Sequence, residues 1–352
     1  MPDAELRRRL QTAMDDACAR GEECGCQLTV YRHGELVCEL CAGRTAPDRT
    51  REVTPRTLFP VFSVGKGVVA TLVHILAERG CVDYAGKVAD LWPGYAANGK
   101  AETLVYELLS HRAGLYEFPN GFPFSDWFKW DRAVARLEAM APLDRIGGMH
   151  HYHGMTFGVL AGHLAECAAG RDLRTLLREE ILDRLGIGDL FFGVPEERMG
   201  DLALIDGSGF PADRRLDFNA PEVLCGLNPS ANGAANATSI AKMYAALLPE
   251  GLDGVRLLSE ATVDRAATLC RAPGDADLSH WDKFGLGYAL CGPPGDLGRM
   301  FGHGGACGSE GFADRKTGFA VGFTKNRLNA THPVHPLRNE ISAILGLPAR
   351  VW

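Results

Sequence analysis

The sequence contains two Ser-x-x-Lys tetrads, Ser63-Val64-Gly65-Lys66 and Ser239-Ile240-Ala241-Lys242. Residues three apart lie on one face of a helical turn, so this spacing brings a hydroxyl and an amine within hydrogen-bond reach. A serine that gives its proton to a neighbouring base becomes a nucleophile for acyl transfer through a covalent intermediate. Each tetrad is therefore a candidate catalytic pair, and the surrounding residues must decide between them.

The residues around Ser63 favour the first tetrad. They predict a buried helix that ends near Gly80, because apolar residues cover most of its faces: Val68, Val69, Leu72, Val73, Ile75 and Leu76. Such a helix carries Lys66 into an apolar core, where burial lowers the pKa of the amine and lets it act as a base. Ser63 lies at the start of the helix, where backbone N–H groups favour a developing anion.

The second tetrad is the weaker candidate. Ser239 is predicted to open an amphipathic helix at the surface, with Lys242 reaching solvent. In enzymes that use this tetrad, a Tyr or Ser motif follows it and a Lys-Thr-Gly strand comes last. Ser230-Ala231-Asn232 resembles the middle motif but precedes Ser239, so a set built on Ser239 is out of order.

Two segments compete for the role of the third element, His303-Gly304-Gly305 and Lys316-Thr317-Gly318. The stretch "ADRKTG" around the second is polar, has an Asp near its start and closes with Gly, which is typical of a turn between two strands. The first lies in a Gly-rich strand, whose missing side chains let the backbone approach a substrate closely. We therefore expect His303-Gly304-Gly305 to face the serine.

Composition limits the class of protein. The 352 residues are 46% apolar and 23% charged, with a formal net charge of −7, which indicates a soluble globular protein. The acidic balance argues against nucleic acid as a partner, and no run of about 18 apolar residues predicts a membrane span. The N-terminal stretch reads as a charged amphipathic helix without an apolar export signal, so we expect a cytoplasmic protein.

The cysteines predict free thiols and no metal site. Their number, 11, is odd, which fits a reducing compartment. A cluster near the N-terminus, Cys24, Cys26, Cys38 and Cys41, suggests zinc at first sight. However, this region reads as a hairpin turning at His33-Gly34, which points Cys38 and Cys41 to opposite faces.

The order of predicted elements indicates a sheet assembled from both ends of the chain. After the N-terminal helix and hairpin, helices and irregular loops continue to about residue 249. Strands return in "FGLGYAL", "RMFGHGGACGSEGFA" and "GFAVGFTKN", and a helix closes the chain. We expect a discontinuous sheet domain over 1–68 and 250–352, a helical domain over 69–249, and an active site between them.

Taken together, the motifs "FSVGK", "ELLSHRAGL", "HYHGMTFG", "NGAANATSIAKMYAAL" and "GHGGACGSEGFAD" resemble those of serine β-lactamase-related proteins. The resemblance covers residues 24–328 and is closest to the class C-like branch with family VIII carboxylesterases and related acyltransferases. It implies an α/β (α+β) fold of the β-lactamase/transpeptidase type. In this fold a mainly antiparallel sheet is flanked by N- and C-terminal helices and packed on a helical domain.

The resemblance also implies roles for individual residues. Ser63 would be the nucleophile, Lys66 its basic partner, and Tyr152 the tyrosine of the middle motif, able to pass a proton between serine and leaving group. The alternative for Tyr152 is a buried aromatic at a helix entry. The backbone N–H groups of Ser63 and Ala306 would form the oxyanion hole. The expected substrate contacts are His303, Gly304, Gly305, His153 and Trp127.

Two departures from the family pattern bear on the substrate. The middle motif usually reads Tyr-x-Asn, but here it is Tyr152-His153-Gly154. His303 replaces the lysine of penicillin-recognising members, and a largely neutral imidazole suits a carboxylate less well than a permanent cation. Both changes favour neutral esters. The histidines at 150, 151 and 153 are interpreted as polar lining rather than metal ligands, and no cofactor is expected.

These observations predict a serine acyl hydrolase that works through an acyl-Ser63 intermediate, with carboxylic ester hydrolysis as the favoured reaction. The alternative is a transacylase that passes the acyl group to an amine or alcohol in small-molecule (natural-product) biosynthesis. A β-lactamase, a D-Ala-D-Ala peptidase and a non-catalytic binding protein are less favoured. The expected partner is a small-molecule acyl substrate, and the expected oligomeric state is a monomer or weak dimer. The aromatic segment Gly114–Trp130 either packs a long loop or forms an apolar wall for the substrate.

Overall fold

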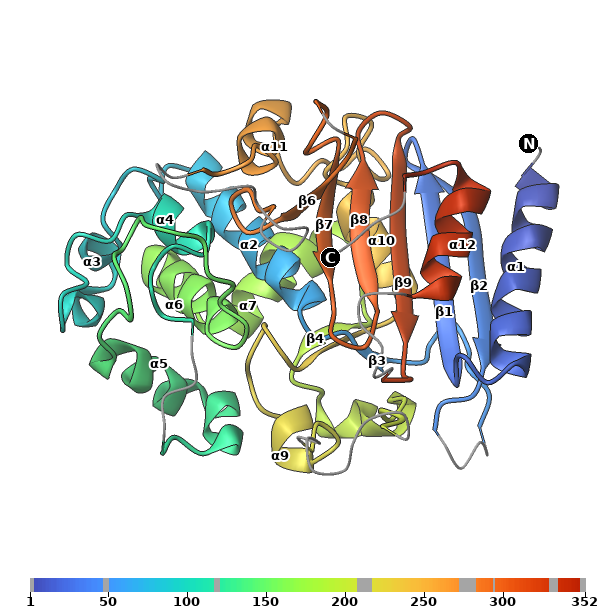
Figure 1. The fold of residues 1–352 in the computed structure, drawn as a ribbon, viewed down its shortest axis with the longest axis horizontal. Helices are drawn as coiled ribbons and strands as arrows, with labels where there is room; N and C mark the ends of the chain where they lie inside the picture. Colours follow the sequence, from blue (N-terminus) through green and yellow to red (C-terminus); the bar gives the residue numbers. More distant parts are fainter. Residues whose placement is uncertain are drawn as a thin grey trace.

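A six-stranded antiparallel sheet forms the centre of the molecule in the computed structural model, which describes residues 3–46, 51–116, 121–207, 217–271, 283–293, 295–328 and 335–348 (Figure 1). The strand order is β2-β1-β9-β8-β7-β6. The strands are β1 (Gly25–Arg32), β2 (Glu35–Gly43), β6 (Ala289–Cys291), β7 (Met300–Gly304), β8 (Glu310–Asp314) and β9 (Phe319–Lys325). Because β1 pairs with β9, the two ends of the chain meet in one sheet, as predicted.

The predicted turns of this sheet are confirmed. β1 and β2 are joined at His33-Gly34, both with positive φ (52° and 79°). The strand expected in "FGLGYAL" is shorter than predicted, since β6 begins only at Ala289, after the turn at Gly287 (φ 83°). The segment containing Lys316 is indeed the turn between β8 and β9.

Two terminal helices cover one face of the sheet. They are α1 (Asp3–Ala19) and α12 (Pro336–Leu345), which lie side by side over β1, β2 and β9 (Figure 1). Their apolar faces share one core with the sheet, because every second side chain of a strand points to the same face. This core includes Leu10, Met14, Val321, Phe323 and Ile341.

The opposite face is covered by α10 (Ala237–Ala245), and here the sequence interpretation was wrong. The helix that contains Ser239 is buried against β1, β8 and β9 instead of lying at the surface. Two strand glycines explain its position: a Cβ at Gly311 would lie 2.3 Å from Ile240 Cγ2, and one at Gly322 would lie 2.1 Å from Ala237 O. Glycines in the strands therefore let the helix approach the sheet closely.

Helix α2 (Val64–Glu78) runs from the sheet into the helical part of the molecule (Figure 1). It is almost wholly buried, as predicted, and Arg79-Gly80 ends it with Gly80 at φ 74°. It packs on α6 (Phe157–Ala169) and beside β7. Because its first turn lies beside β7, α2 holds Ser63 at the junction between sheet and helices.

Shorter elements complete the fold. A second sheet, not predicted from the sequence, has the order β3-β5-β4 and consists of β3 (Phe59–Pro60), β5 (Gly233–Ala235) and β4 (Leu190–Phe192). The remaining α-helices are α3 (Val88–Leu91), α4 (Val105–Leu109), α5 (Trp130–Ala139), α7 (Leu173–Leu177), α8 (Asp183–Leu185), α9 (Pro221–Leu224) and α11 (Glu260–Ala266). The other helical turns are η1 (Pro93–Ala96), η2 (Phe124–Phe128), η3 (Arg178–Leu182) and η4 (Glu196–Asp201).

The expected division into 1–68 with 250–352 and 69–249 stays a prediction, although α10 belongs by sequence to the second part and packs on the sheet. None of the helices in the described ranges is long and apolar enough to cross a membrane.

Candidate active site

Ser63 and Lys66 meet on the first turn of α2. Lys66 Nζ donates a hydrogen bond to Ser63 Oγ at 2.8 Å and a second to the carbonyl oxygen of Ser230 at 3.3 Å. Ser63 Oγ also lies 3.4 Å from that carbonyl oxygen. The three-residue spacing therefore gives the hydroxyl–amine contact expected from the sequence.

Burial sets the charge of Lys66. The side chain is fully buried, and this burial holds the pKa of the amine well below its ordinary value of 10.5. Its hydrogen-bond partners in the described residues are a hydroxyl and a carbonyl, so neither is an anion that would stabilise an ammonium group. A neutral amine has a lone pair and can accept the serine proton along the same 2.8 Å contact.

Tyr152 completes a three-residue cluster. Its ring lies beneath Lys66, with Nζ 4.9 Å from the ring centroid, and its hydroxyl is near enough to the Ser63 side chain for that side chain to affect its pKa. The side chain as a whole is 38% exposed. The hydroxyl end is desolvated, however, and this raises the pKa of the phenol, while the nearby Ser63 side chain lowers it in part. Tyr152 is thus protonated near neutral pH and can relay a proton.

Two backbone N–H groups near Ser63 are available to bind an oxyanion. The N–H of Ser63 and that of Ala306 have no hydrogen-bond partner within the described part of the chain, and Ala306 is exposed. Close backbone contact brings their segments together, because a Cβ at Gly305 would lie 2.3 Å from the carbonyl oxygen of Val61. Phe62, which shares its peptide bond with Ser63, has a positive φ of 49°, a strained conformation that often accompanies function.

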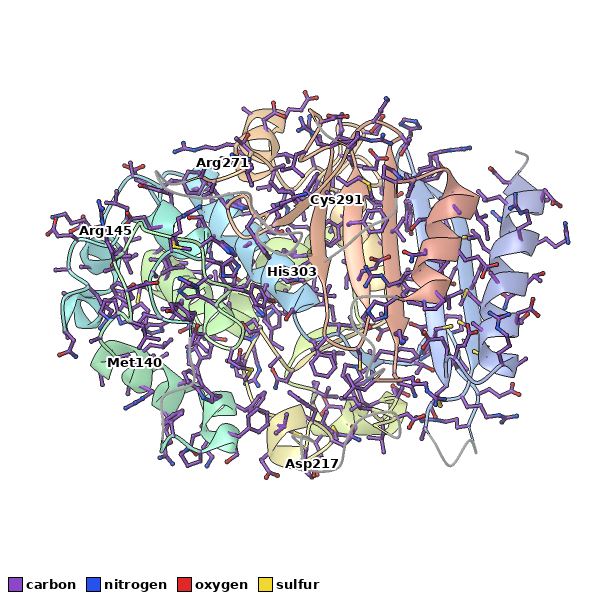
Figure 2. The ribbon with its side chains drawn as sticks, in the orientation of Figure 1. Met140, Arg145, Asp217, Arg271, Cys291 and His303 are labelled. Carbon is purple, nitrogen blue, oxygen red and sulfur yellow. The ribbon has the colours of Figure 1, made fainter. Side chains whose placement is uncertain are left out.

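His303 lies on β7 beside the first turns of α2 (Figure 2). Its Nδ1 lies 2.7 Å from the carbonyl oxygen of Gly304, so Nδ1 must carry the proton. Burial lowers the pKa of His303 to about 3, with the neighbouring Lys66 as a smaller contribution. His303 is therefore neutral at physiological pH, with an unprotonated Nε2.

The comparisons with known proteins agree with this geometry. A family model described as Beta-lactamase matches residues 6–343. The chain belongs to the beta-lactamase family. It is 34% identical over 337 residues to the Mycobacterium tuberculosis protein named Esterase/beta-lactamase LipL, which covers 86% of this chain and 77% of that protein.

Two solved structures of similar proteins cover almost the whole chain. A family VIII carboxylesterase has a TM-score of 0.86 and 28% identity, over 98% of this chain and 97% of that chain. A penicillin-binding protein homolog from Caulobacter crescentus has a TM-score of 0.84 and 31% identity, over 96% of each chain. The expected β-lactamase/transpeptidase-like fold is confirmed.

Two of the expected substrate contacts in this beta-lactamase family member, His153 and Trp127, are buried. His153 is fully buried, and both ring nitrogens are engaged: Nδ1 donates to the carbonyl oxygen of His151 at 2.6 Å, and Nε2 accepts from the N–H of Leu115 at 3.2 Å. Trp127 is also fully buried and packs edge-on against Phe122. Both side chains are buried in the described structure, so their assignment as substrate contacts stays a prediction.

The described side chains of the aromatic segment pack on one another and on neighbouring rings. Phe124 contacts Phe128 and Phe218 edge-on, and Tyr116 stacks on His151. The part at 117–120, with Phe118, lies outside the described residues. The described side chains thus favour loop packing over a substrate wall.

The neighbouring histidines do not converge on a common point. His150 stacks on the ring of Phe284, with centroids 5.2 Å apart, whereas His151 Nε2 pairs with Asp144 at 2.9 Å. No group of three or more His, Cys, Asp or Glu side chains suited to a metal ion occurs among the described residues.

The competing motifs lie away from Ser63. Ser239 is buried in α10, and Lys242 Nζ lies 3.4 Å from the carbonyl oxygens of Leu185 and Gly186. Lys316 follows β8, whose last residue, Asp314, pairs with Met300 at the start of β7. His303 lies toward the other end of that strand.

Sequence reasoning missed the carbonyl of Ser230 as a partner of both Ser63 and Lys66. The turn that carries it is held by Asn228, whose Oδ1 accepts from the N–H of Ser230 at 2.9 Å. Ser230 Oγ in turn accepts from the N–H of Gly158 on α6 at 2.6 Å. The Ser-Ala-Asn motif was the available signal, but it was considered only with the Ser239 tetrad, where it is out of order.

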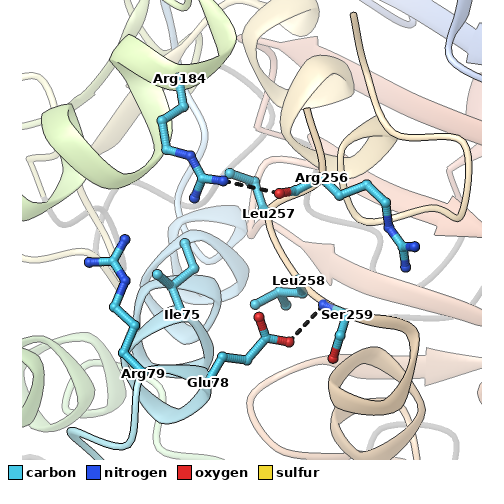
Figure 3. Close-up of a pocket in the computed structure, with 8 residues that line it drawn as sticks. All are labelled: Ile75, Glu78, Arg79, Arg184, Arg256, Leu257, Leu258 and Ser259. Carbon is cyan, nitrogen blue, oxygen red and sulfur yellow. Dashed lines mark hydrogen bonds between the residues drawn. The ribbon is translucent and has the colours of Figure 1, made fainter. Parts of the chain in front are cut away.

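A separate pocket of about 460 Å³ lies at the far end of α2 (Figure 3). It is lined by Ile75, Glu78, Arg79, Arg184, Arg256, Leu257, Leu258 and Ser259. Arg79 pairs with Glu180, and Arg184 donates to the carbonyl oxygen of Arg256 at 3.0 Å. The hydroxyl in its lining, Ser259 Oγ, caps α11 by accepting from the N–H of Thr262 at 3.2 Å, whereas Ser63 contacts the amine of a buried lysine. We therefore place the candidate active site at Ser63.

Proposed function

We propose that the protein hydrolyses carboxylic esters of small molecules through an acyl-Ser63 intermediate. The observation that carries the proposal is the 2.8 Å contact between Ser63 Oγ and a fully buried Lys66 amine. A lysine of ordinary pKa would be protonated and could not accept the serine proton, whereas burial makes this one a base.

In the acylation step, Ser63 Oγ attacks the ester carbonyl carbon while Lys66 takes the hydroxyl proton. The N–H groups of Ser63 and Ala306 stabilise the negative charge on the carbonyl oxygen. Tyr152 gives its hydroxyl proton to the leaving alkoxide, which departs as an alcohol, and takes in return the proton held by Lys66. Water then enters, the same groups take its proton, and Ser63 is regenerated as the acid leaves.

The charge state of the site supports a neutral substrate. Burial lowers the pKa of Lys66 well below its ordinary value, which favours its neutral form, and it lowers the pKa of His153 and His303 to about 3. The described residues around Ser63 thus supply no stable cation for a substrate carboxylate, which disfavours penicillins and peptide C-termini. The names Esterase/beta-lactamase LipL and family VIII carboxylesterase among the relatives are consistent with esters.

Intact-mass analysis tests the proposal. The protein is mixed with p-nitrophenyl butyrate or with benzylpenicillin, quenched in acid and weighed. We expect an acyl adduct from the ester that is lost in Ser63→Ala but retained in Ser239→Ala, the matched control in the other tetrad. An adduct that persists in Ser63→Ala would overturn the assignment of the nucleophile, and an adduct from penicillin alone would overturn the substrate class.

A further inference from the structure

The Nε2 atom of His303 is a buried hydrogen-bond acceptor that lacks a donor in the described part of the protein. The residue is 4% exposed, and its Nδ1–H is already used by the carbonyl of Gly304. A buried polar atom left without a partner destabilises the folded state, so such an atom calls for an explanation. One explanation is a hydrogen-bond donor that is present only during the reaction.

The position of His303 indicates which donor that is. Its ring centroid lies 6.0 Å from that of Tyr152 and 5.8 Å from that of Phe284. A Cβ at Gly67, one residue after Lys66, would lie 3.7 Å from the Cβ of His303. Figure 2 shows His303 next to α2. The imidazole ring that carries Nε2 therefore lies beside Tyr152 and the first turns of α2, which carry Lys66. The alcohol that leaves and the nucleophile that enters must both exchange a proton with the pair Lys66 and Tyr152.

The leaving oxygen, an entering alcohol and an entering water differ in the number of hydrogens that they bring to the acyl carbon. The leaving oxygen of an ester carries no hydrogen until the pair protonates it. An entering alcohol has one hydrogen, which it gives to the pair. Water has two, so one remains for a second acceptor.

We propose that His303 Nε2 accepts a hydrogen bond from the second hydrogen of the hydrolytic water, and so makes water a better nucleophile than an alcohol at acyl-Ser63. This inference rests on the proposed function and names the acceptor of the acyl group. Water oxygen bonds to the acyl carbon and the bond from that carbon to Ser63 Oγ breaks. One water proton passes through Lys66 and Tyr152 to Ser63 Oγ, and the other stays on the carboxylic acid product, held by Nε2.

A matched pair of variants tests the role of Nε2. In His303→Asn the amide can replace the Nδ1–H bond to Gly304, but nothing replaces Nε2. In His303→Gln the amide reaches the position of Nε2 and offers an oxygen acceptor there. The measurement is the ratio of methyl ester to free acid formed from p-nitrophenyl butyrate in buffer with methanol. This ratio reports on the acyl-enzyme whichever step limits turnover.

We expect the ester-to-acid ratio to rise about tenfold in His303→Asn, the effect of one lost hydrogen bond to the water, and to stay near that of the parent in His303→Gln. Thermal unfolding curves check that both variants are folded. An unchanged ratio in His303→Asn would overturn the proposal, and so would equal shifts in both variants, which would indicate altered packing. A parent that neither hydrolyses the ester nor forms an acyl-Ser63 adduct would overturn the proposed function and this inference with it. A normal adduct with an unchanged ratio would overturn only the role of His303.

Discussion

At the scale of single residues, the chemistry depends on the protonation of one amine. Lys66 is active as the neutral form, and burial lowers its pKa well below 10.5. Activity is therefore lost only as the pH falls through this lowered pKa, and it is fully present at higher pH. His303, with a pKa of about 3, stays neutral throughout and adds no inflexion near neutral pH.

The first prediction follows from the lowered pKa of Lys66. The value of kcat/KM for a neutral ester should be flat from about pH 8 to pH 10, because the lowered pKa of Lys66 favours its neutral form over this range. The check is a pH–rate profile corrected for spontaneous hydrolysis of the ester. A rise in kcat/KM that follows an ordinary lysine, centred near 10.5, would show that burial does not set the charge of Lys66.

The second prediction concerns the coupling between Lys66 and Tyr152. Lys66 Nζ contacts Ser63 Oγ at 2.8 Å and lies 4.9 Å from the ring centroid of Tyr152. Lys66→Ala and Tyr152→Phe should each slow acylation by about 10²-fold or more. The double variant should be little slower than the worse single one, since groups that act as a unit are not additive. Single-turnover rates measure this, and full additivity would mean that the two residues work in separate steps.

At the scale of elements, the site depends on close contact between strand β7 and the segment that leads into α2. Gly305 has no room for a side chain because a Cβ there would lie 2.3 Å from the carbonyl oxygen of Val61. The N–H of Gly305 also donates to the carbonyl oxygen of Ser309 at 2.7 Å, which closes the turn that carries Ala306.

The third prediction uses this contact. Gly305→Ala should push the turn away from Ser63 and lower kcat by about 10²-fold, because the Ala306 N–H no longer meets the oxyanion. KM should change much less. Gly188→Ala is the matched control, since a Cβ at Gly188 meets nothing within 4 Å. Equal effects of the two substitutions on kcat would mean that the position of this turn does not affect catalysis.

The same scale shows what the sequence could predict. Spacing and periodicity along one segment predicted α2, the β1–β2 hairpin and the turn containing Lys316, because each depends on neighbouring residues. The position of α10 was missed, since it depends on Gly311 and Gly322 in strands distant along the chain. The contact between Lys66 and the carbonyl of Ser230 joins residues 164 apart and leaves no local pattern.

At the scale of the whole molecule, two buried ion pairs tie the ends of the chain to the sheet. Lys325 Nζ on β9 bonds Glu23 after α1 at 2.6 Å, and both side chains are at most 5% exposed. Arg338 on α12 lies 3.1 Å from Glu310 on β8, also buried. The first pair adjoins the candidate site, because the N–H of Lys325 donates to Ser309 Oγ at 3.1 Å. The packing of the termini thus supports the turn that carries Ala306.

The last prediction tests this support through the free energy of unfolding. Lys325→Met removes one partner of a buried pair and leaves the Glu23 carboxylate without its cation, which costs about 3 kcal/mol at neutral pH. Burial already raises the pKa of Glu23, and losing Lys325 raises it further. A carboxyl group whose pKa is raised in the folded state stabilises it only at low pH and loses that contribution as the pH rises. The loss in Lys325→Met should therefore be smaller at pH 5 than at pH 8.

Lys87→Met is the control, because the side chains of Lys87 and its partner Glu102 are 43% and 80% exposed, and losing this pair changes the free energy of unfolding by less than about 1 kcal/mol. Urea unfolding at both pH values measures the difference, and a loss independent of pH would mean that Glu23 does not become the unpaired charge.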